Sequence, residues 1–222
     1  MTRLWVWAIA TSVVFACASN SKSAAPPPAE QAPHPSFGGH DWDSVYRRGT
    51  GFSQKETATL AQAITGEKPG RALDVGMGQG RNALFLARKG WTVTGFDVSS
   101  VGVEQAKAVA KNEGLSLDAQ VADADAYDYG TAKWDLVALI YVGGADLAAK
   151  VDASLKPGGL VVVEFFHKDM EGPHGHSMGA FATGELKQLF AGYEIIRDEV
   201  VDDVAEWGGQ RSKLVRFVAR KK

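Results

Sequence analysis

Short apolar runs alternate with stretches of helical periodicity through the middle of the chain. Runs of Val, Ile, Leu and Ala bounded by Gly or polar residues are typical of strands buried on both faces of a sheet. They predict strands near 71–75, 92–97, 117–121, 134–140 and 159–166. Apolar residues at helical spacing predict helices near 81–89, 100–113, 144–154 and 183–191. This alternation predicts a parallel sheet covered by helices on both faces.

The tail of the chain has a different pattern. Two strand-like runs, 193–201 and 213–219, are joined by a polar segment that contains Gly208 and Gly209. No helical pattern separates them, so we expect an antiparallel hairpin. With the five strands above, the expected fold is an α/β, doubly wound, mostly parallel sheet of seven strands that ends in this hairpin.

The N-terminal segment looks like an export signal. Arg3 precedes an apolar stretch, 4–16, that is short for a membrane span but suits the apolar part of a secretory signal. Cys17 is the only cysteine of the chain, and with the small Ala16 before it the site resembles the processing box of bacterial lipoproteins. Cys17 is therefore a candidate for a lipid tether to a membrane. An uncleaved anchor with an incidental cysteine is the alternative.

The next segment, 18–36, is rich in Ser, Ala and Pro, and such a composition cannot bury a core. We therefore expect a signal-like or lipoprotein-like segment at 1–17, an extended linker at 18–36 and one folded domain at 37–222. The expected location is membrane-anchored or periplasmic, or cytoplasmic if the true start lies later.

Composition and charge agree with one globular domain. The chain has 222 residues, of which 45% are hydrophobic and 23% charged, and its formal net charge is −2. These values are typical of a domain with an ordinary core. A net charge near zero argues against nucleic acid as a general partner. The sequence does not indicate an oligomeric state.

The strongest chemical signal is a glycine-rich turn between the first predicted strand and the first predicted helix. Asp74 comes just before three alternate glycines, Gly76, Gly78 and Gly80. Such residues tolerate positive φ and let a ligand lie against bare backbone, while the helix start offers N–H groups. Asp97 ends the second predicted strand, where doubly wound folds place a carboxylate that accepts bonds from ribose hydroxyls. The pattern predicts a site for a ligand that contains a nucleoside.

The glycine spacing separates two kinds of nucleoside ligand. Arg81 stands where the dinucleotide pattern Gly-x-Gly-x-x-Gly would have its last glycine. With Asp74 in front, the string instead resembles the Asp/Glu-x-Gly-x-Gly-x-Gly signature of class I S-adenosylmethionine-dependent methyltransferases. Three further stretches resemble that family in the right order: 121–124, 133–141 and 155–163. The resemblance covers about residues 70–165 and implies a Rossmann-like fold with S-adenosylmethionine as cofactor.

The resemblance also implies roles for the positions that match the family's motifs. Seven of them are candidate cofactor-binding residues: Asp74, Gly76, Gly78 and Gly80 at the amino-acid portion, Asp97 at the ribose, and Asp123 with Ala124 at the adenine. Asp125 and Asp128 are alternative readers of the adenine. Asp74 could instead be a carboxylate that caps the loop.

Three residues are candidates on the acceptor side. The segment 41–49 resembles the leading helix that many small methyltransferases fold across the cofactor, where Tyr46 would approach the methionine portion. Tyr141 directly follows the fourth predicted strand, where the family lines the transfer site. His167 opens a histidine-containing segment after the fifth strand and is a candidate proton acceptor or substrate contact. The spacing of its histidines matches no zinc site, so we expect no metal.

The sequence thus favours transfer of a methyl group from S-adenosylmethionine to a small-molecule acceptor by in-line displacement. Little sequence is left for a separate substrate domain, which argues against a macromolecular acceptor. The compact domain and the Arg-Asn pair after the glycines resemble the tellurite-resistance and thiopurine branches of the family. Two alternatives stay open: an NAD-type nucleotide-dependent oxidoreductase, and an exported, non-catalytic binding protein that kept the fold.

Overall fold

The computed structural model describes residues 41–49, 53–170 and 181–222. The predicted signal-like segment 1–17, with Cys17, and the predicted linker 18–36 lie outside these ranges. Within them, we find no helix with the length and apolar character that a bilayer crossing requires.

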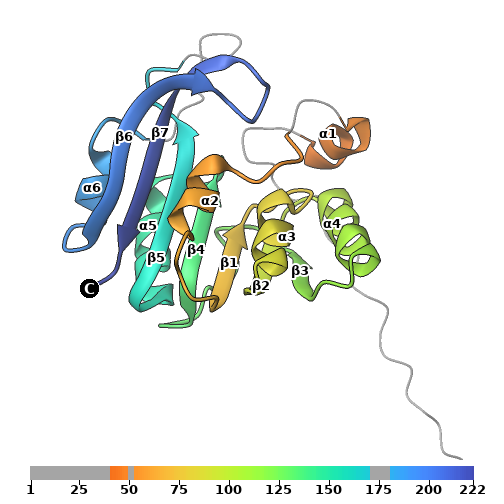
Figure 1. Cartoon of the computed structure of the whole chain (residues 1–222). Coiled ribbons are helices and arrows are strands. Elements are labelled where there is room, and N and C mark those ends of the chain that lie inside the picture. The colour runs from red at the N-terminus through yellow and green to blue at the C-terminus, as the bar shows by residue number, and fades with distance from the viewer. Residues whose placement is uncertain (1–40, 50–52, 171–180) are drawn as a thin grey trace, which may run out of the picture. The chain divides into compact units, whose positions relative to one another are not determined.

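A seven-stranded sheet forms the centre of the domain (Figure 1). Its strands are β1 (Arg71–Val75), β2 (Thr92–Asp97), β3 (Leu117–Val121), β4 (Trp134–Ile140), β5 (Leu155–Phe166), β6 (Glu194–Val204) and β7 (Arg211–Arg220). Their order across the sheet is β3-β2-β1-β4-β5-β7-β6. The first five strands run parallel, and β7 is antiparallel to both β5 and β6. The predicted fold is confirmed, including its terminal hairpin.

Helices cover both faces of this sheet. They are α1 (Trp42–Arg48), α2 (Ala58–Ala63), α3 (Arg81–Arg88), α4 (Ser100–Asn112), a 3-10 turn η2 (Ala145–Leu147), α5 (Ala148–Ser154) and α6 (Glu185–Leu189). Side chains of β1 and β4 alternate between the faces. Leu73 and Val137 pack in one apolar cluster with residues of α5 and α6. Ala72 and Leu136 pack in another with residues of α2, α3 and α4. Burial on both faces explains why these strands read as continuous apolar runs.

Three strands, β5, β6 and β7, extend beyond their predicted ends. β5 begins at Leu155 rather than 159, because Leu155 pairs with Trp134 across an irregular register before the regular ladder starts at Leu160. Pro157 and Gly158 in that stretch are signals for a turn, which hid the pairing in the sequence. β6 continues to Val204 and pairs there with Arg211.

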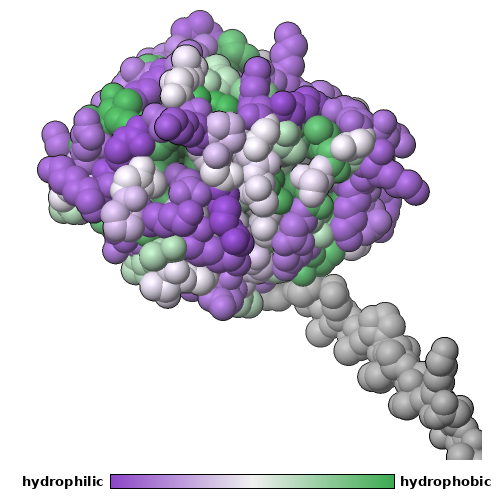
Figure 2. Space-filling model, turned by 60° about the horizontal axis from the view of Figure 1, so that its bottom comes forward, coloured by the Kyte–Doolittle hydropathy of each residue, from purple (hydrophilic) through white to green (hydrophobic). Residues whose placement is uncertain are grey.

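The outer surface is that of an ordinary globular domain. On the face that Figure 2 turns forward, hydrophilic side chains predominate and hydrophobic ones are interspersed among them. Single apolar side chains on a surface need no special explanation.

The order of the strands identifies the carboxyl edge of the sheet as the place for a ligand. The connection from β1 leads to β2 on one side, whereas the connection from β4 leads to β5 on the other. In doubly wound folds, ligands bind outside the carboxyl ends of the strands at such a switch point. Gly76, Asp97 and Tyr141 stand at or just after these ends.

Candidate functional site

The glycine turn after β1 is built so that side chains are excluded from it. Gly76 and Gly78 have φ values of 61° and 55°. A Cβ on Gly78 would lie 2.5 Å from the hydroxyl of Tyr46, and one on Gly76 would lie 2.5 Å from Cγ2 of Val142. Both positions therefore need glycine for conformation and for space. Gly80 begins α3, and a Cβ there would press on Ala106 of α4, so its role is the packing of two helices.

Asp97 anchors this turn. Its Oδ2 accepts a hydrogen bond from the N–H of Gly78, and its Oδ1 accepts one from the N–H of Ser99, both at 2.8 Å. Burial raises the pKa of Asp97 to about 6, although these two backbone hydrogen bonds act to lower it. Each carboxylate oxygen can accept a second hydrogen bond. Asp97 can therefore hold the glycine turn and still accept bonds from ribose hydroxyls.

Asp74 lies beneath the turn rather than in a cavity. Its side chain is 1% exposed, and Oδ2 is buried without a hydrogen-bond partner within the described residues. Burial raises the pKa of Asp74 to about 7, and the charge of Arg81 opposes the shift. Protein atoms enclose the carboxyl group, and it accepts a hydrogen bond from the backbone N–H of Ala83 in α3, as a carboxylate that caps the start of a helix would.

The two buried carboxyl groups predict an unusual pH dependence of stability. Both pKa values lie above the ordinary value of 3.8, so the folded chain holds protons that the unfolded chain has lost. The free energy of unfolding of the cofactor-free chain should fall by on the order of 1 kcal/mol per pH unit between pH 5 and 7 and level off above pH 7. Urea unfolding across this range measures it. Asp74→Asn should flatten the slope, and an unchanged slope would exclude Asp74 as its source.

Two cavities meet at the carboxyl edge of the sheet, and they share Trp42, Tyr46, Gly76 and Tyr141. We call the first, of about 580 Å³ including the space open at its mouth, the glycine-turn cavity. The second, of about 680 Å³ measured in the same way, is the carboxylate cavity.

The carboxylate cavity brings together the residues predicted for adenosine. Asp97, Asp123 and Ala124 all line it, together with the apolar Phe96 and Leu147. Asp125 also lines the cavity, and its N–H donates to Oδ1 of Asp123 at 2.8 Å. Asp128, the other alternative, is not among the described residues that line it. The cavity is therefore an apolar slot with carboxylates around it, which suits a flat base and a ribose.

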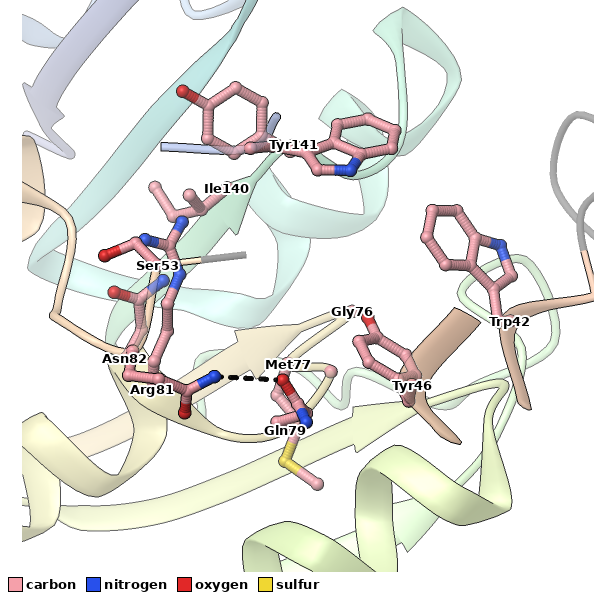
Figure 3. Close-up of a pocket in the computed structure, with 13 residues that line it drawn as sticks. Trp42, Tyr46, Ser53, Gly76, Met77, Gln79, Arg81, Asn82, Ile140 and Tyr141 are labelled. Atoms are coloured by element: carbon pink, nitrogen blue, oxygen red, sulfur yellow. Dashed lines mark hydrogen bonds between the residues drawn. The ribbon is translucent and has the colours of Figure 1, made fainter. Parts of the chain in front are cut away.

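The glycine-turn cavity carries a cation that the sequence did not single out as a site residue. Arg81 is the one cationic side chain among the described residues that line either cavity. Its guanidinium is paired with Glu206 of the β6–β7 turn and donates to the carbonyl of Lys55 at 3.1 Å. In Figure 3, Arg81 and Asn82 stand on one side of the cavity, and Trp42 and Tyr46 stand on the other. The sequence signal that could have identified Arg81 is its position as the first helical residue after the glycines.

Helix α1 lies against the glycine turn through Tyr46. Asp43 accepts hydrogen bonds from Oγ of Ser99 at 2.6 Å and from the N–H of Val101 at 3.2 Å, which fixes α1 to the start of α4. The Tyr46 side chain thereby reaches Gly78 and is buried. Burial, and secondarily the charge of Asp97, raise the pKa of Tyr46 well above its ordinary value.

Tyr141 lines both cavities. Its φ of 57° is unusual for a residue with a side chain and costs on the order of 1–3 kcal/mol. Its hydroxyl donates to Oε1 of the buried Glu164 at 2.9 Å and accepts from the N–H of Glu206 at 3.4 Å. Burial, and then the charge of Glu164, raise the pKa of Tyr141 well above its ordinary value. At neutral pH both tyrosines stay protonated and serve as walls and donors.

His167 lies away from both cavities. Its ring is buried, Nε2 lies 3.0 Å from Oγ1 of Thr183, and Nδ1 accepts from the N–H of Asp169 at 3.1 Å. These contacts occupy both ring nitrogens. A proton-accepting role for His167 stays a prediction. The later histidines of this segment, 174 and 176, lie outside the described residues. Among the described residues, no group of three or more His, Cys, Asp or Glu could hold a metal ion.

Sequence relatives share part of this chain. Residues 72–159 match the family model of a methyltransferase domain. Hemagglutinin 1 of Eikenella corrodens is 29% identical over 149 residues, which is 64% of this chain and 50% of that protein. A ubiquinone biosynthesis O-methyltransferase of Brucella anthropi is 33% identical over 148 residues, which is 64% of this chain and 60% of that protein. The chain thus spans about half of the first relative and three fifths of the second.

Solved structures share the fold. TehB from Haemophilus influenzae aligns with a TM-score of 0.66 at 18% identity, over 82% of this chain and 67% of that one. A 1,6-didemethyltoxoflavin-N1-methyltransferase from Burkholderia thailandensis, solved with 1,6-didemethyltoxoflavin and S-adenosylhomocysteine, aligns with a TM-score of 0.57 at 20% identity, over 74% of this chain and 79% of that one. Residues 72–159 of the chain therefore match a methyltransferase domain, and the chain has the fold of the class I S-adenosylmethionine-dependent methyltransferases.

Proposed function

We propose that this chain transfers a methyl group from S-adenosylmethionine to a small-molecule acceptor. The observation that carries the proposal is a pair of adjoining cavities, one lined by carboxylates and the other by a cation. Asp97 and Asp123 line one of them, where they suit the hydroxyl and amino groups of adenosine, and Arg81 lines the other. When bound, the cofactor supplies an electrophilic methyl group on a positively charged sulfur.

The chain's own part in the reaction is to align and to exclude water. In-line displacement requires the acceptor and the methyl group to be held at near-attack distance, and orientation can supply much of the rate. Trp42, Tyr46 and Tyr141 surround the junction of the two cavities, so their rings can shield that point from solvent. The size of the glycine-turn cavity favours a small acceptor.

Arg81 is our candidate for the cofactor's carboxylate. The carboxylate cavity is lined by Asp97, Asp123, Asp125 and Asp146, and like charges would repel a further carboxylate there. The amino-acid portion must then extend past the shared Gly76 into the glycine-turn cavity, where Arg81 is the cation available. A guanidinium matches a carboxylate in geometry as well as in charge.

Arg81→Gln should therefore weaken one part of cofactor binding selectively. We expect the dissociation constant for S-adenosylhomocysteine to rise by about tenfold or more, through loss of a charge-assisted bond. Binding of 5′-methylthioadenosine, which lacks the amino-acid portion, should stay the same. Titration calorimetry of both ligands measures this difference. Arg88→Gln is the matched control, because Arg88 lies on the same helix and pairs with the exposed Glu113. Equal losses for both ligands would mean that Arg81 only supports the turn.

The activity itself is tested with the full chain. Titration with S-adenosylmethionine and with NADH in parallel separates the proposal from an NAD-type oxidoreductase, which would bind NADH alone. Incubation with cofactor labelled in its methyl group and a panel of thiols, phenols, amines and metalloid oxyanions should yield a labelled small molecule. Failure to retain cofactor would favour an exported binding protein that kept the fold.

The location of the chain is a separate proposal, supported by sequence alone. We propose that Cys17 tethers the chain to a membrane, so that the chain is membrane-anchored or periplasmic, and that a small molecule rather than nucleic acid is the partner. Membrane fractionation of cells that make the full chain, with Cys17→Ser beside it, tests the tether. A chain that stays in the soluble fraction in both forms would overturn the tether.

A further inference from the structure

Three aromatic side chains from distant parts of the chain meet at the glycine-turn cavity. Trp207 of the β6–β7 turn lies with its ring centroid 5.7 Å from that of Trp42 in α1 and 6.1 Å from that of Tyr141 after β4. All three line the cavity and all are partly exposed. We call this group the aromatic corner. Figure 3 shows two of its members, Trp42 and Tyr141, on adjoining sides of the cavity.

The aromatic corner is held in place from behind. Phe166, which is buried at the end of β5, lies 5.7 Å from Trp207 between ring centroids. The turn that carries Trp207 is closed by two backbone hydrogen bonds, from the N–H of Ala205 to the carbonyl of Gln210 at 2.9 Å and from the N–H of Gly209 to the carbonyl of Ala205 at 3.1 Å. The carbonyl of Glu206 also accepts from the N–H of Ser53 at 3.1 Å. A partner that meets these rings therefore does not have to order them first, which favours binding.

The charges at the cavity separate two classes of acceptor. A small inorganic oxyanion needs several cations or N–H donors around it. The described lining supplies one cation, Arg81, and the proposed function assigns that cation to the carboxylate of the cofactor. The remaining polar lining is made of side-chain amides and hydroxyls, and the amides of Gln54 and Gln79 bond to each other at 3.2 Å. This lining suits a flat ring with polar groups at its edge better than a compact anion.

The two cavities also divide the aromatic residues by role. Trp42 and Tyr141 line both cavities and so face the cofactor as well as the acceptor. Trp207 lines the glycine-turn cavity alone. Trp207 is therefore the member of the aromatic corner that can contact an acceptor but does not line the cavity proposed for adenosine.

We propose that the aromatic corner receives the flat ring of an aromatic methyl acceptor, with Trp207 as the residue that selects for it. This inference rests on the proposed methyl transfer and names the substrate class for it. Stacked and edge-to-face contacts between rings stabilise an aromatic ligand beyond the burial of its apolar surface. A saturated ring of similar size buries similar surface but makes no such contacts.

The experiment compares flat and saturated rings on the full chain saturated with S-adenosylhomocysteine. Phenol with cyclohexanol, and 2-naphthol with decahydro-2-naphthol, are matched pairs, and tellurite represents the oxyanions. Dissociation constants from NMR titration should be about tenfold lower for the aromatic member of each pair. Trp207→Ala should remove most of this preference and leave the affinity for S-adenosylhomocysteine within about twofold.

Two further variants make the test specific. Trp207→Phe should keep most of the preference, because it retains a ring. Ile196→Ala is the matched control, since Ile196 is exposed on the same hairpin and should change neither ligand's affinity. Equal affinity for flat and saturated rings, or tighter binding of tellurite, in a chain that retains S-adenosylhomocysteine would overturn the inference alone. A chain that prefers aromatic rings but retains no S-adenosylhomocysteine would overturn the proposed methyl transfer instead.

Discussion

Replacing Gly78 by alanine should abolish most cofactor binding while the domain still folds. The added Cβ would lie 2.5 Å from the hydroxyl of Tyr46 and 3.0 Å from its Cζ, so α1 or the turn must move. The Gly78 N–H, which now donates to Asp97, would move with it. We expect the dissociation constant for S-adenosylhomocysteine to rise by about a hundredfold or more, which corresponds to about 3 kcal/mol. Titration calorimetry of the purified variant measures the loss.

Backbone strain alone must be separated from this effect. Gly78 has φ 55°, and a residue with a side chain pays about 1–2 kcal/mol in the left-handed region. Gly114 is the matched control, because its φ is 67° and a Cβ there would meet nothing within 4 Å. Gly114→Ala should lose similar stability in urea unfolding and keep full affinity for the cofactor. If both variants bind equally well, the contact between Tyr46 and the turn does not shape the site.

The fold could be predicted from sequence because most of its strands are buried on both faces. Such strands leave continuous apolar runs, and five predicted ranges fell on observed strands. Helix α2 was missed because its six residues are too few to show a helical period, and its N-cap Thr57 makes no side-chain cap bond. Short elements of this kind are specified by tertiary contacts, as when the backbone N–H of Thr57 donates to the Asn82 side chain.

The residues on the cofactor side of the candidate site could also be predicted from sequence, because they lie at the ends of strands. The turn after β1, the end of β2 and the start of the segment after β3 must meet at one edge of a parallel sheet. The acceptor side was not readable, because it depends on contacts between distant residues. Glu206 reaches Arg81 across 125 positions of sequence, and Trp207 arrives with it. His167 was a candidate because it directly follows a strand. In the structure its Nε2 lies 3.0 Å from Oγ1 of Thr183.

Asp97→Ala should weaken the binding of every ligand that contains the cofactor's ribose. The ionised carboxylate is expected to accept charge-assisted bonds from the ribose hydroxyls, each worth about 1.5–3 kcal/mol. Its loss should raise the dissociation constants of S-adenosylhomocysteine and 5′-methylthioadenosine alike, by about a hundredfold. Arg81→Gln should affect the first ligand alone, so the two variants together locate the two ends of the cofactor. Asp118→Ala is the matched control, since Asp118 is an exposed carboxylate on the neighbouring β3.

The pH dependence of the same titration distinguishes a bond to ribose from a purely structural role. Because the pKa of Asp97 is raised to about 6 in the cofactor-free chain, its ionised fraction falls as the pH drops from 8 to 5. Affinity for 5′-methylthioadenosine should fall over the same interval, since a protonated carboxyl group loses acceptor strength. Asp97→Asn cannot titrate, and its weaker affinity should stay constant. A wild-type affinity that does not change with pH, together with full binding by Asp97→Asn, would mean that Asp97 serves the glycine turn through Gly78 and does not touch the ligand.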